Sequence, residues 1–563
     1  MPHIITQPCC NDASCVDECP VNCIHPTPNE PEFATAEMLY IDPDTCIDCG
    51  ACIPACPVKA IYPDDNLLND NVGRYLQINA DYFTDHDVSG GLVPPREAAS
   101  VPADKELAVA IVGAGPAAFY AAAELVKHDA VTVDMFDRLP TPYGLVRAGV
   151  APDHPSTKGV EATYAATGDN PNFNYLLNVT VGEHITAAEL TERYGAVVYA
   201  VGASTDKHLG IDGENLSGSI SATAFVAWYN GHPDYADFDV DLSGERAVVV
   251  GNGNVAMDVA RILLDDPDRL AKTDIADHAL QKLRDSNIRE VVILGRRGIA
   301  QAAFTIGEFI AMGDLSGVDV VIDPAELVLD AHSQSAEDSG SLDSSIATRL
   351  RVARDFAARP LTEGNKRVVF RFLVSPTVLS GDGKVESITL VRNEFTETAG
   401  RVGVKATGQT ETLDAALVMR AVGYTGVPVA EGVPFDEARG VIPNEGGRVL
   451  EAAGGQKVPG LYVTGWIKRG ATGGIGRNRQ CGEETARAVI EDFLEGVTPT
   501  PAGSRDDVVE LVTRRGADII DAAGWENIDT AERSAGKEAG RRRVKFVSIS
   551  AMQAAARGPA IAR

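Results

Sequence analysis

Four closely spaced cysteines near the amino end constrain the fold of this chain most. Cys46, Cys49, Cys52 and Cys56 are separated by two, two and three residues, and Pro57 follows the last of them. In this spacing three consecutive thiolates converge on one iron–sulfur cluster, while the cysteine before the proline turns away to a second cluster. The pattern therefore predicts that this part of the chain folds around two clusters and carries out one-electron chemistry.

A second, imperfect ladder lies upstream, and its register repeats the first from Cys9, with Asp12 where a cysteine is expected. Crossed ligation then gives one cluster four thiolates, those of Cys19, Cys46, Cys49 and Cys52. The other cluster receives three, those of Cys9, Cys15 and Cys56. We expect a three-iron cluster there, or a four-iron cluster completed by Asp12 or by water. Cys10 competes with Cys9, but the register and the strain of adjacent ligands favour Cys9.

Zinc sites and disulfides are the alternatives for a cysteine-rich segment. Zinc would favour two separated pairs of ligands rather than two interleaved quartets. Disulfides need an oxidising compartment, and no secretory signal opens the sequence, so we expect a cytoplasmic protein with reduced thiols. Cys23 and Cys481 stand outside both ladders. We expect these two to be small buried hydrophobic residues.

Charge and hydropathy narrow the function further. The formal net charge of −30 argues against nucleic acid as a partner, because a phosphate-binding face needs clustered lysine and arginine. No apolar run approaches the ~20 residues that a membrane span needs. Residues 1–70 carry twelve acidic residues and a single base, Lys59. Such an acidic module suits docking to basic redox partners, although plain solubility explains the charge equally well.

Two glycine-rich segments each read as strand, tight turn, helix and strand. The first contains Gly113, Gly115 and Ala118, and its second strand ends at Asp137. The first glycine permits the turn, the second lets a pyrophosphate approach the backbone at a helix N-terminus, and the alanine allows close packing of helix on strand. Asp137 is placed to bind ribose hydroxyl groups. This segment predicts a dinucleotide-binding fold.

The second segment contains Gly251 and Gly253, and its next strand ends at Arg296 and Arg297. An NAD site would present a carboxylate there, whereas guanidinium groups complement a 2′-phosphate and select NADPH. A solvated basic pair is the alternative. FAD in the first fold and NADPH in the second is the sensible assignment, because a flavin accepts two electrons together and can release them one at a time.

Four further motifs carry a family resemblance, and they span residues 139–147, 149–155, 251–261 and 465–476. From about Glu106 onward the chain resembles the adrenodoxin reductase family of NADPH–ferredoxin reductases, and residues 1–70 resemble a bacterial seven-iron ferredoxin. The whole is similar to a fused ferredoxin and ferredoxin–NADP reductase. The resemblance implies an α/β flavoprotein with two dinucleotide-binding domains, the NADPH fold inserted in the FAD fold, and an N-terminal α+β ferredoxin domain.

The resemblance and the strand pattern divide the chain into five parts. We expect a ferredoxin with two clusters over 1–70, a linker over 71–105, the first part of the FAD domain over 106–204, the NADPH domain over 205–418, and the second part of the FAD domain with a C-terminal extension over 419–563. The linker is polar and rich in glycine and proline, which is typical of a tether. A basic patch over 541–545 is expected to be a solvated helix end, or alternatively a docking face for the ferredoxin.

The resemblance also implies which residues hold the nucleotides. FAD would be held by Gly113, Gly115, Ala118, Asp137, Leu145, Val181, Trp466, Gly473, Gly474 and Ile475. NADPH would be bound by Asn252, Gly253, Asn254, Val255, Arg296, Arg297, Glu308 and Gly473. Trp466 is expected to shield the flavin, and a helix beginning after Gly476 would direct its positive end at the flavin ring.

His154 is a candidate for tuning the flavin or delivering a proton, and a structural histidine in its Pro-Asp-His-Pro turn is the alternative. Ala471 stands where the family usually has proline. Arg479 stands where the family usually has lysine, so the cation is kept.

These features predict an NADPH–ferredoxin reductase that passes hydride from NADPH to FAD, and then single electrons through its own clusters to a ferredoxin or a cytochrome P450 system. One alternative is an electron-input subunit similar to the small subunit of glutamate synthase, although the cysteine spacing of that family is looser. Another is a redox-sensing cluster module attached to a diaphorase, because a cluster site that lacks one thiolate can gain or lose iron.

Overall fold

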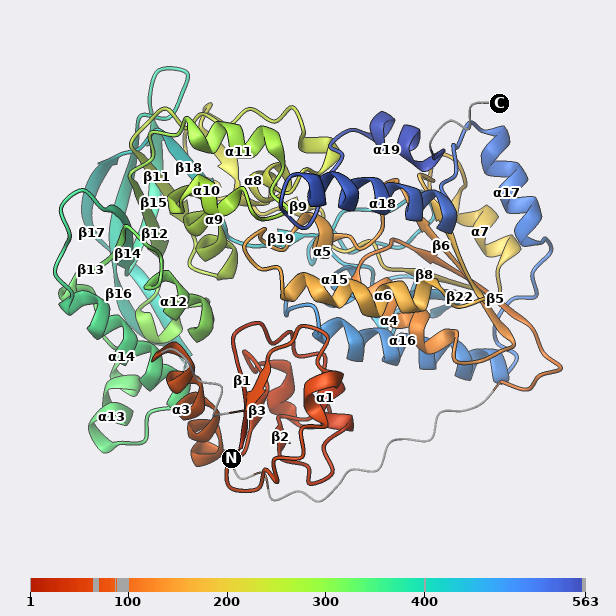
Figure 1. Cartoon of the computed structure of the whole chain (residues 1–563), viewed down its shortest axis with the longest axis horizontal. Helices are drawn as coiled ribbons and strands as arrows, with labels where there is room; N and C mark the ends of the chain where they lie inside the picture. The colour runs from red at the N-terminus through yellow and green to blue at the C-terminus, as the bar shows by residue number, and fades with distance from the viewer. Residues whose placement is uncertain (1, 64–69, 87, 89–100, 399–400, 559–563) are drawn as a thin grey trace.

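Two sheets with parallel strands form the frame of the molecule, and a small N-terminal module lies between the helices that cover them (Figure 1). The computed structural model describes residues 2–63, 70–86, 88, 101–398 and 401–558. Among these residues, no helix is both long enough and apolar enough to span a lipid bilayer.

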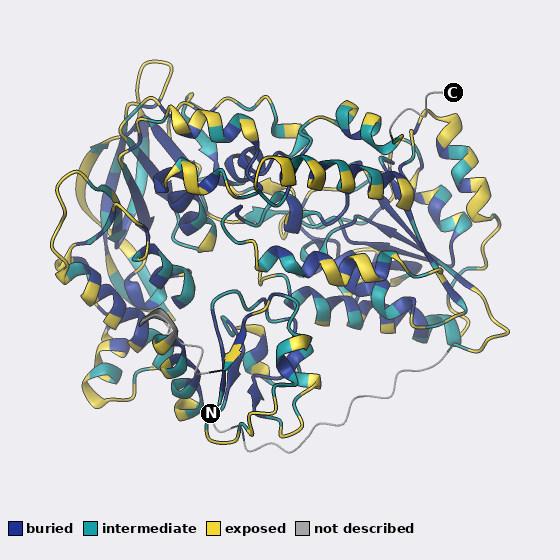
Figure 2. Cartoon of the chain, in the orientation of Figure 1, coloured by how far each residue is buried: buried dark blue, intermediate teal, exposed yellow. Residues whose placement is uncertain are grey.

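The first sheet has seven strands in the order β20-β21-β22-β8-β5-β6-β7. Its parallel strands are β5 (Leu107–Val112), β6 (Val131–Asp137), β7 (Phe173–Leu177), β8 (Ala196–Tyr199) and β22 (Lys457–Val463). The antiparallel edge is formed by β20 (Asn444–Glu445) and β21 (Arg448–Leu450). Helices α4 (Pro116–Leu125) and α16 (Arg477–Leu494) pack against each other on this domain. The central strands are nearly continuous runs of buried apolar residues, because helices cover the sheet (Figure 2).

The second sheet has six strands in the order β10-β18-β11-β12-β14-β13, all parallel. They are β10 (Ser219–Ser221), β11 (Arg246–Val250), β12 (Glu290–Gly295), β13 (Val318–Ile322), β14 (Lys366–Phe372) and β18 (Leu417–Arg420). An antiparallel sheet of β15 (Val374–Ser380), β16 (Ser387–Thr398) and β17 (Arg401–Asp414) extends this domain. The chain crosses between the two domains through the antiparallel pair β9 (Thr205–Asp206) and β19 (Tyr424–Thr425). The second fold is therefore inserted in the first, as the sequence predicts.

The N-terminal module is built from short paired elements. Strand β1 (His3–Ile5) pairs with β4 (Ile61–Pro63), and β2 (Ile24–His25) pairs with β3 (Tyr40–Ile41). Two one-turn helices, α1 (Ser14–Asp17) and α2 (Cys52–Ala55), contact each other beside these strands. Because these elements are short, much of the module consists of the loops that carry its cysteines.

The segment expected to begin the linker is partly helical, since residues Asp70–Asp85 form helix α3. The Asn79 side chain accepts hydrogen bonds from the backbone N–H groups of Ile5 and Ile41, at 3.1 and 2.9 Å, and donates to the Ile5 carbonyl oxygen. Helix α3 therefore belongs to the frame of the module. Residues 87 and 89–100 of the expected tether lie outside the described residues.

The C-terminal extension forms helices α17 (Arg505–Arg514), α18 (Ala522–Glu538) and α19 (Ile549–Ala556). The expectation for the basic patch was wrong, because two of its side chains are buried inside the molecule. Arg543 donates to the Glu532 carboxylate at 2.8 Å, and Arg147 donates two further hydrogen bonds to the same group. Lys545 pairs with Asp274 at 3.0 Å. Buried carboxylates draw these cations inward, and the patch ties the extension to both nucleotide domains.

Candidate functional site

A cavity of about 1850 Å³ lies between the two domains, and both glycine loops line it. Gly113 and Gly251 have φ angles of +106° and +116°, and a Cβ atom on either would lie within 2.6 Å of a carbonyl oxygen in an adjacent segment. A Cβ atom on Gly115 or Gly253 would meet nothing within 4 Å. The first glycine of each loop is thus required by the fold, and the second leaves open space in which a phosphate can approach the backbone.

Each glycine loop leads directly into a helix. Helix α4 starts at Pro116 and α9 (Asn254–Leu264) starts after Gly253, so the unpaired N–H groups of both helix ends are available to an anion. Asp137 accepts hydrogen bonds from the backbone N–H groups of Ala114 and Leu139, at 2.8 and 2.9 Å, and burial raises its pKa. This carboxylate therefore shapes the first glycine loop as well as lining the cavity.

The structure brings the predicted nucleotide-binding residues together. All of them except Ala118 line this one cavity: Gly113, Gly115, Asp137, Leu145, Val181, Asn252, Gly253, Asn254, Val255, Arg296, Arg297, Glu308, Trp466, Gly473, Gly474 and Ile475. Ala118 is fully buried in α4, which agrees with the packing role expected of it. The helix predicted after Gly476 is α16, which begins at Arg477.

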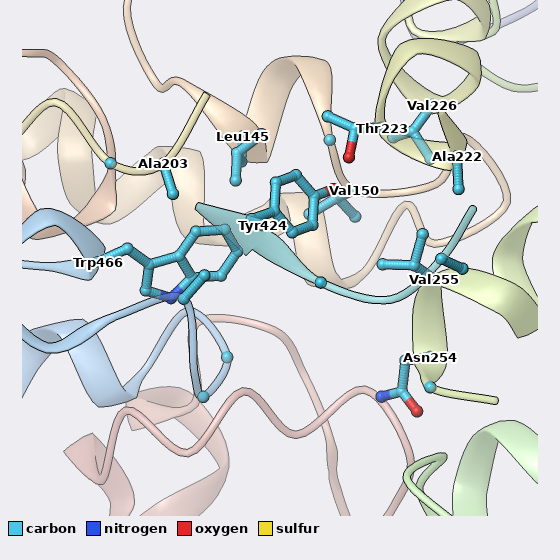
Figure 3. A pocket seen from close by; sticks show the side chains of 18 of the residues that line it. Leu145, Val150, Ala203, Ala222, Thr223, Val226, Asn254, Val255, Tyr424 and Trp466 are labelled. Carbon is cyan, nitrogen blue, oxygen red and sulfur yellow. The ribbon is translucent and has the colours of Figure 1, made fainter. Parts of the chain in front are cut away.

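The floor of the cavity offers apolar surface for a flat ring. Leu145, Val422 and Val427 line it and remain more than one-third exposed. The buried Trp466 Nε1–H has no hydrogen-bond partner among the described residues, which suits an acceptor on a bound group. Tyr424, which sequence reasoning missed, packs beside Trp466 with ring centroids 5.3 Å apart (Figure 3). These observations fit a flavin at this side of the cavity.

The side of the cavity that the second domain forms carries the predicted cations. Arg296 and Arg297 follow β12 and are exposed, so both guanidinium groups are free to meet a phosphate. The Asn254 side chain accepts a hydrogen bond from the Thr305 N–H at 2.8 Å, which orients the start of α9. In Figure 3, Asn254 and Val255 lie on one side of Tyr424, with Trp466 on the other. The residues present fit a 2′-phosphorylated dinucleotide.

A charged cluster lies where the two halves of the cavity meet. His154, Asp258 and Glu308 present ligand atoms within 4.8 Å of one another. Arg261, which is almost fully buried in α9, bonds to all three, and also to Asp153 at 2.8 Å. A guanidinium group therefore supplies the positive charge that a metal ion would bring. Burial and Arg261 lower the pKa of His154, but Asp258 and Glu308 outweigh them, so its pKa lies above the usual value.

The cysteines of the module fall into two sets. The outer cysteine set, which lines one small pocket, consists of Cys19, Cys46, Cys49 and Cys52. Cys23 lines the same pocket, and its Sγ lies 3.4 Å from the Sγ of Cys19. It is buried as expected, but its place beside a predicted ligand was missed. Its position four residues after Cys19 was the available signal.

The inner cysteine set consists of Cys9, Cys15 and Cys56. Burial, followed by the charges of neighbouring thiols and Asp12, raises the pKa of Cys15. Coordination by iron is what would ionise such thiols. The Asp12 carboxylate accepts a hydrogen bond from the Ser14 hydroxyl at 2.6 Å, and burial raises its pKa. Cys9 also lines the large cavity, so the inner set lies on the side of the module that faces the nucleotide domains.

The module contacts the first domain through the start of α16. The Gly476 N–H donates to the Cys10 carbonyl oxygen at 2.7 Å. The Arg479 guanidinium donates to the Asp12 carbonyl oxygen and to the Asp17 carboxylate, each at 2.9 Å. Arg479, noted in the sequence only as a departure from the family, therefore holds the module in place.

The module also contacts the second domain. Glu37 accepts a hydrogen bond from the Ile306 N–H at 2.7 Å and pairs with Arg349 at 2.8 Å. Gln7 donates to the Glu308 carboxylate at 2.7 Å. Residue spacing gave no signal for Gln7 or Glu37, because their partners lie far away in the chain. The module thus bridges both nucleotide domains beside the cavity.

Two dinucleotide folds that share one cavity, with a cysteine-rich module docked beside it, define a pyridine-nucleotide-dependent flavoprotein oxidoreductase with an iron–sulfur domain. A family model described as pyridine nucleotide-disulphide oxidoreductase matches residues 107–298, and one described as 4Fe-4S binding domain matches residues 39–62. The chain is 45% identical to the "Probable ferredoxin/ferredoxin--NADP reductase" of Mycobacterium tuberculosis, over 99% of this chain and 95% of that protein. It belongs to the ferredoxin/ferredoxin–NADP reductase family.

Relatives that match about four-fifths of the chain support the same family assignment. The NADPH-ferredoxin reductase FprA of M. tuberculosis is 49% identical over 78% of this chain and 97% of its own length. A solved structure of M. tuberculosis FprA in complex with NADPH has a TM-score of 0.76 at 48% identity, covering 81% of this chain and all of that chain. The mitochondrial NADPH:adrenodoxin oxidoreductase of Arabidopsis thaliana is 40% identical over 80% of this chain and 96% of its own length.

Proposed function

We propose that this protein oxidises NADPH and delivers the electrons one at a time through its own N-terminal module to an acceptor protein, either a ferredoxin or a P450-type system. The observation that carries the proposal is the docked module. Cys9 of its inner cysteine set lines the shared cavity, and the Cys10 carbonyl oxygen accepts a hydrogen bond from the Gly476 N–H at the start of α16. A carrier held beside the cavity needs no diffusional encounter for its first electron.

The residues present fit the cofactors that this activity needs. The open space above Gly115 and the unpaired Trp466 Nε1–H would hold FAD, which supplies the conversion of an electron pair into single electrons when it is bound. Arg296 and Arg297 would hold the 2′-phosphate of NADPH and so select it over NADH. The outer cysteine set would hold a [4Fe-4S] cluster. The inner set would hold a [3Fe-4S] cluster, or a [4Fe-4S] cluster completed by Asp12.

The charged cluster would position the nicotinamide end of the nucleotide. Arg261 fixes the carboxylates of Asp258 and Glu308, which leaves each of them with one defined orientation. Arg261 can donate to His154 Nε2 only while that nitrogen carries no proton, and protonation, which Asp258 and Glu308 favour by raising the pKa of His154, would replace that bond with pairing to the two carboxylates. This role tunes the electrostatic field of the cavity. Hydride transfer itself requires no acid or base from the protein.

Anaerobic titration with NADPH, followed by low-temperature EPR and by iron and labile-sulfide analysis, tests the proposal. We expect both centres to be present and to accept electrons from NADPH, with separate three-iron and four-iron signals if Asp12 is not a ligand. A chain truncated before Glu106 should keep NADPH-dependent dye reduction and lose most cytochrome c reduction. A redox-sensing module would leave both rates unchanged, and zinc without inorganic sulfide would contradict the proposal outright.

A further inference from the structure

The outer cysteine set lies beneath a free face of the module. Val21 and Ile47 line its pocket with side chains that are 37% and 59% exposed, and Cys49 is exposed as well. Ile47 is the most exposed large hydrophobic side chain in the described part of the chain. We call this surface the outer face; it comprises Val21, Ile47 and Cys49, together with Glu18, Asp44 and Asp48, the exposed acids that lie one or two residues from Cys19, Cys46 and Cys49 in the sequence.

The nucleotide domains cover a different side of the module. Arg479 and Gly476 contact the backbone next to the inner cysteine set, and a Cβ atom on Gly159 would lie 2.8 Å from the carbonyl oxygen of Pro57, which follows Cys56. Every residue that lines the pocket at the outer cysteine set, by contrast, belongs to the described module itself. The inner set therefore faces the reductase, and none of the described residues of the nucleotide domains lines the pocket at the outer face.

The charged side chains named on the outer face are all acidic. Glu18 and Asp44 are exposed, and Asp48 is exposed while paired with His3. Lys59 is the single base of residues 1–70. Arg479, which reaches the module from the side of the reductase, is paired with Asp17. An apolar centre with an acidic rim is complementary to an apolar spot with a basic rim, and the opposite charges would speed encounter.

We infer that the outer face is the docking surface for a basic one-electron acceptor protein, with Ile47 and Val21 at the apolar contact and Glu18 and Asp44 facing lysine or arginine side chains. This inference rests on the proposed function and deepens it by naming where the electrons leave and what kind of partner collects them. Each NADPH oxidised to NADP⁺ and a proton gives up two electrons, which reduce two molecules of a one-electron acceptor such as ferric cytochrome c.

Ferric cytochrome c, a basic haem protein, is the probe, and its lysine-acetylated form serves as the charge-depleted control. The test variant of the full-length holoprotein is Glu18→Lys combined with Asp44→Lys. The matched control is Asp382→Lys, another exposed acid that lies in the turn between β15 and β16 on the NADPH-type domain. Iron content is compared across variants to confirm that both clusters are retained.

Two quantities are measured at low ionic strength: the Kd between the oxidised proteins without NADPH, and the second-order rate constant of cytochrome c reduction with NADPH. We expect the double variant to raise the Kd and to lower the rate constant, each by about tenfold, and to reduce the dependence of both on salt. Asp382→Lys should change neither quantity. Acetylated cytochrome c should show little difference between wild type and double variant. Ile47→Ser should weaken binding while leaving its salt dependence unchanged.

Equal affinity of wild type and the double variant for cytochrome c would overturn the inference, as would an equal loss in Asp382→Lys. The proposed function fails by a different result, namely clusters that stay oxidised when NADPH is added. The Kd between the oxidised proteins decides the question of the surface in either case, because that measurement requires no electron transfer.

Discussion

Gly476 has ordinary helical dihedral angles, φ −66° and ψ −30°, so its own backbone does not require glycine. The reason for glycine lies across the interface. A Cβ atom at this position would lie 2.1 Å from the carbonyl carbon of Asn11 and 2.2 Å from both the Asp12 nitrogen and the Cys10 carbonyl oxygen. These are backbone atoms that cannot move aside as a flexible side chain could. One methyl group would therefore push the module away from the start of α16.

Gly476→Ala should separate the module from the reductase while leaving the flavin domain folded, because the clash lies across the interface and the backbone angles of residue 476 are ones that alanine readily adopts. We expect NADPH-dependent dye reduction to persist and cytochrome c reduction to fall by about tenfold, because the docked carrier loses its high effective concentration. Steady-state assays with the two acceptors measure this.

The control is Arg487→Ala, an exposed position on the same helix, which should leave both rates as they are in the wild type. Unchanged cytochrome c reduction in Gly476→Ala would show that the close contact at α16 does not matter for electron delivery.

At the scale of elements, the sequence predicted those helices, strands and turns whose formation depends on residues close together in the chain. The two glycine loops, their flanking strands and the helix after Gly476 formed where the sequence placed them, because tight turns and buried parallel strands are encoded by neighbouring residues. Helix α3 was missed for the opposite reason. Its anchor, Asn79, bonds to Ile5 and Ile41, and nothing in the surrounding sequence reveals such distant partners.

The basic patch near the C-terminus was misread for a related reason. A cluster of arginine and lysine is usually solvated, and only the folded chain shows that Glu532 lies 0% exposed on α18 opposite Arg543. Burial of a charge requires a partner, so the acid and the bases fold inward together. Distant partners also explain why the candidate site was predicted better for glycines than for Arg261, because three of its four partners, Asp153, His154 and Glu308, lie outside helix α9.

Arg543→Ala should destabilise the C-terminal extension, because it leaves the buried Glu532 with one partner fewer. We expect a loss of about 3–5 kcal/mol in unfolding free energy. Chemical denaturation and limited proteolysis of helices α18 and α19 measure it. Arg557→Ala removes an exposed pair with Asp518 and is the control, with an expected change of at most about 1 kcal/mol. Equal effects of the two substitutions would contradict the structural role of the buried network.

At the scale of the whole molecule, the module is a further link between two domains that are also joined by the pair β9 and β19 and by the buried ion pairs of the C-terminal patch. Its contact with the NADPH-type domain depends on Glu37, which pairs with Arg349 and accepts the Ile306 N–H. Glu37→Ala should weaken docking by about 1.5–3 kcal/mol, because the Ile306 N–H and the buried Arg349 guanidinium lose their acceptor. Glu37→Gln should cost less, since the amide oxygen still accepts from Ile306. Small-angle scattering of the holoprotein reports the fraction that is docked.

Docking should also depend on pH through the same residue. Burial raises the pKa of Glu37 above its ordinary value of 4.5, although Arg349 opposes the shift. The docked state therefore binds a proton more readily than the undocked state does. Docking should tighten as pH falls through the range between the two pKa values and weaken as pH rises through it. Scattering across this range measures the effect, and a slope that survives in Glu37→Gln would assign it to another group.

The hydrogen bond from Gln7 to Glu308 joins the carrier to the charged cluster that lines the cavity. A nucleotide that recruits the Glu308 carboxylate must compete with Gln7 or share that group with it. Thermodynamic reciprocity then applies: whatever factor nucleotide occupancy imposes on retention of the carrier, the carrier imposes on nucleotide affinity. Nucleotide binding that displaces Gln7 therefore weakens docking of the module by the same factor by which docking weakens nucleotide binding.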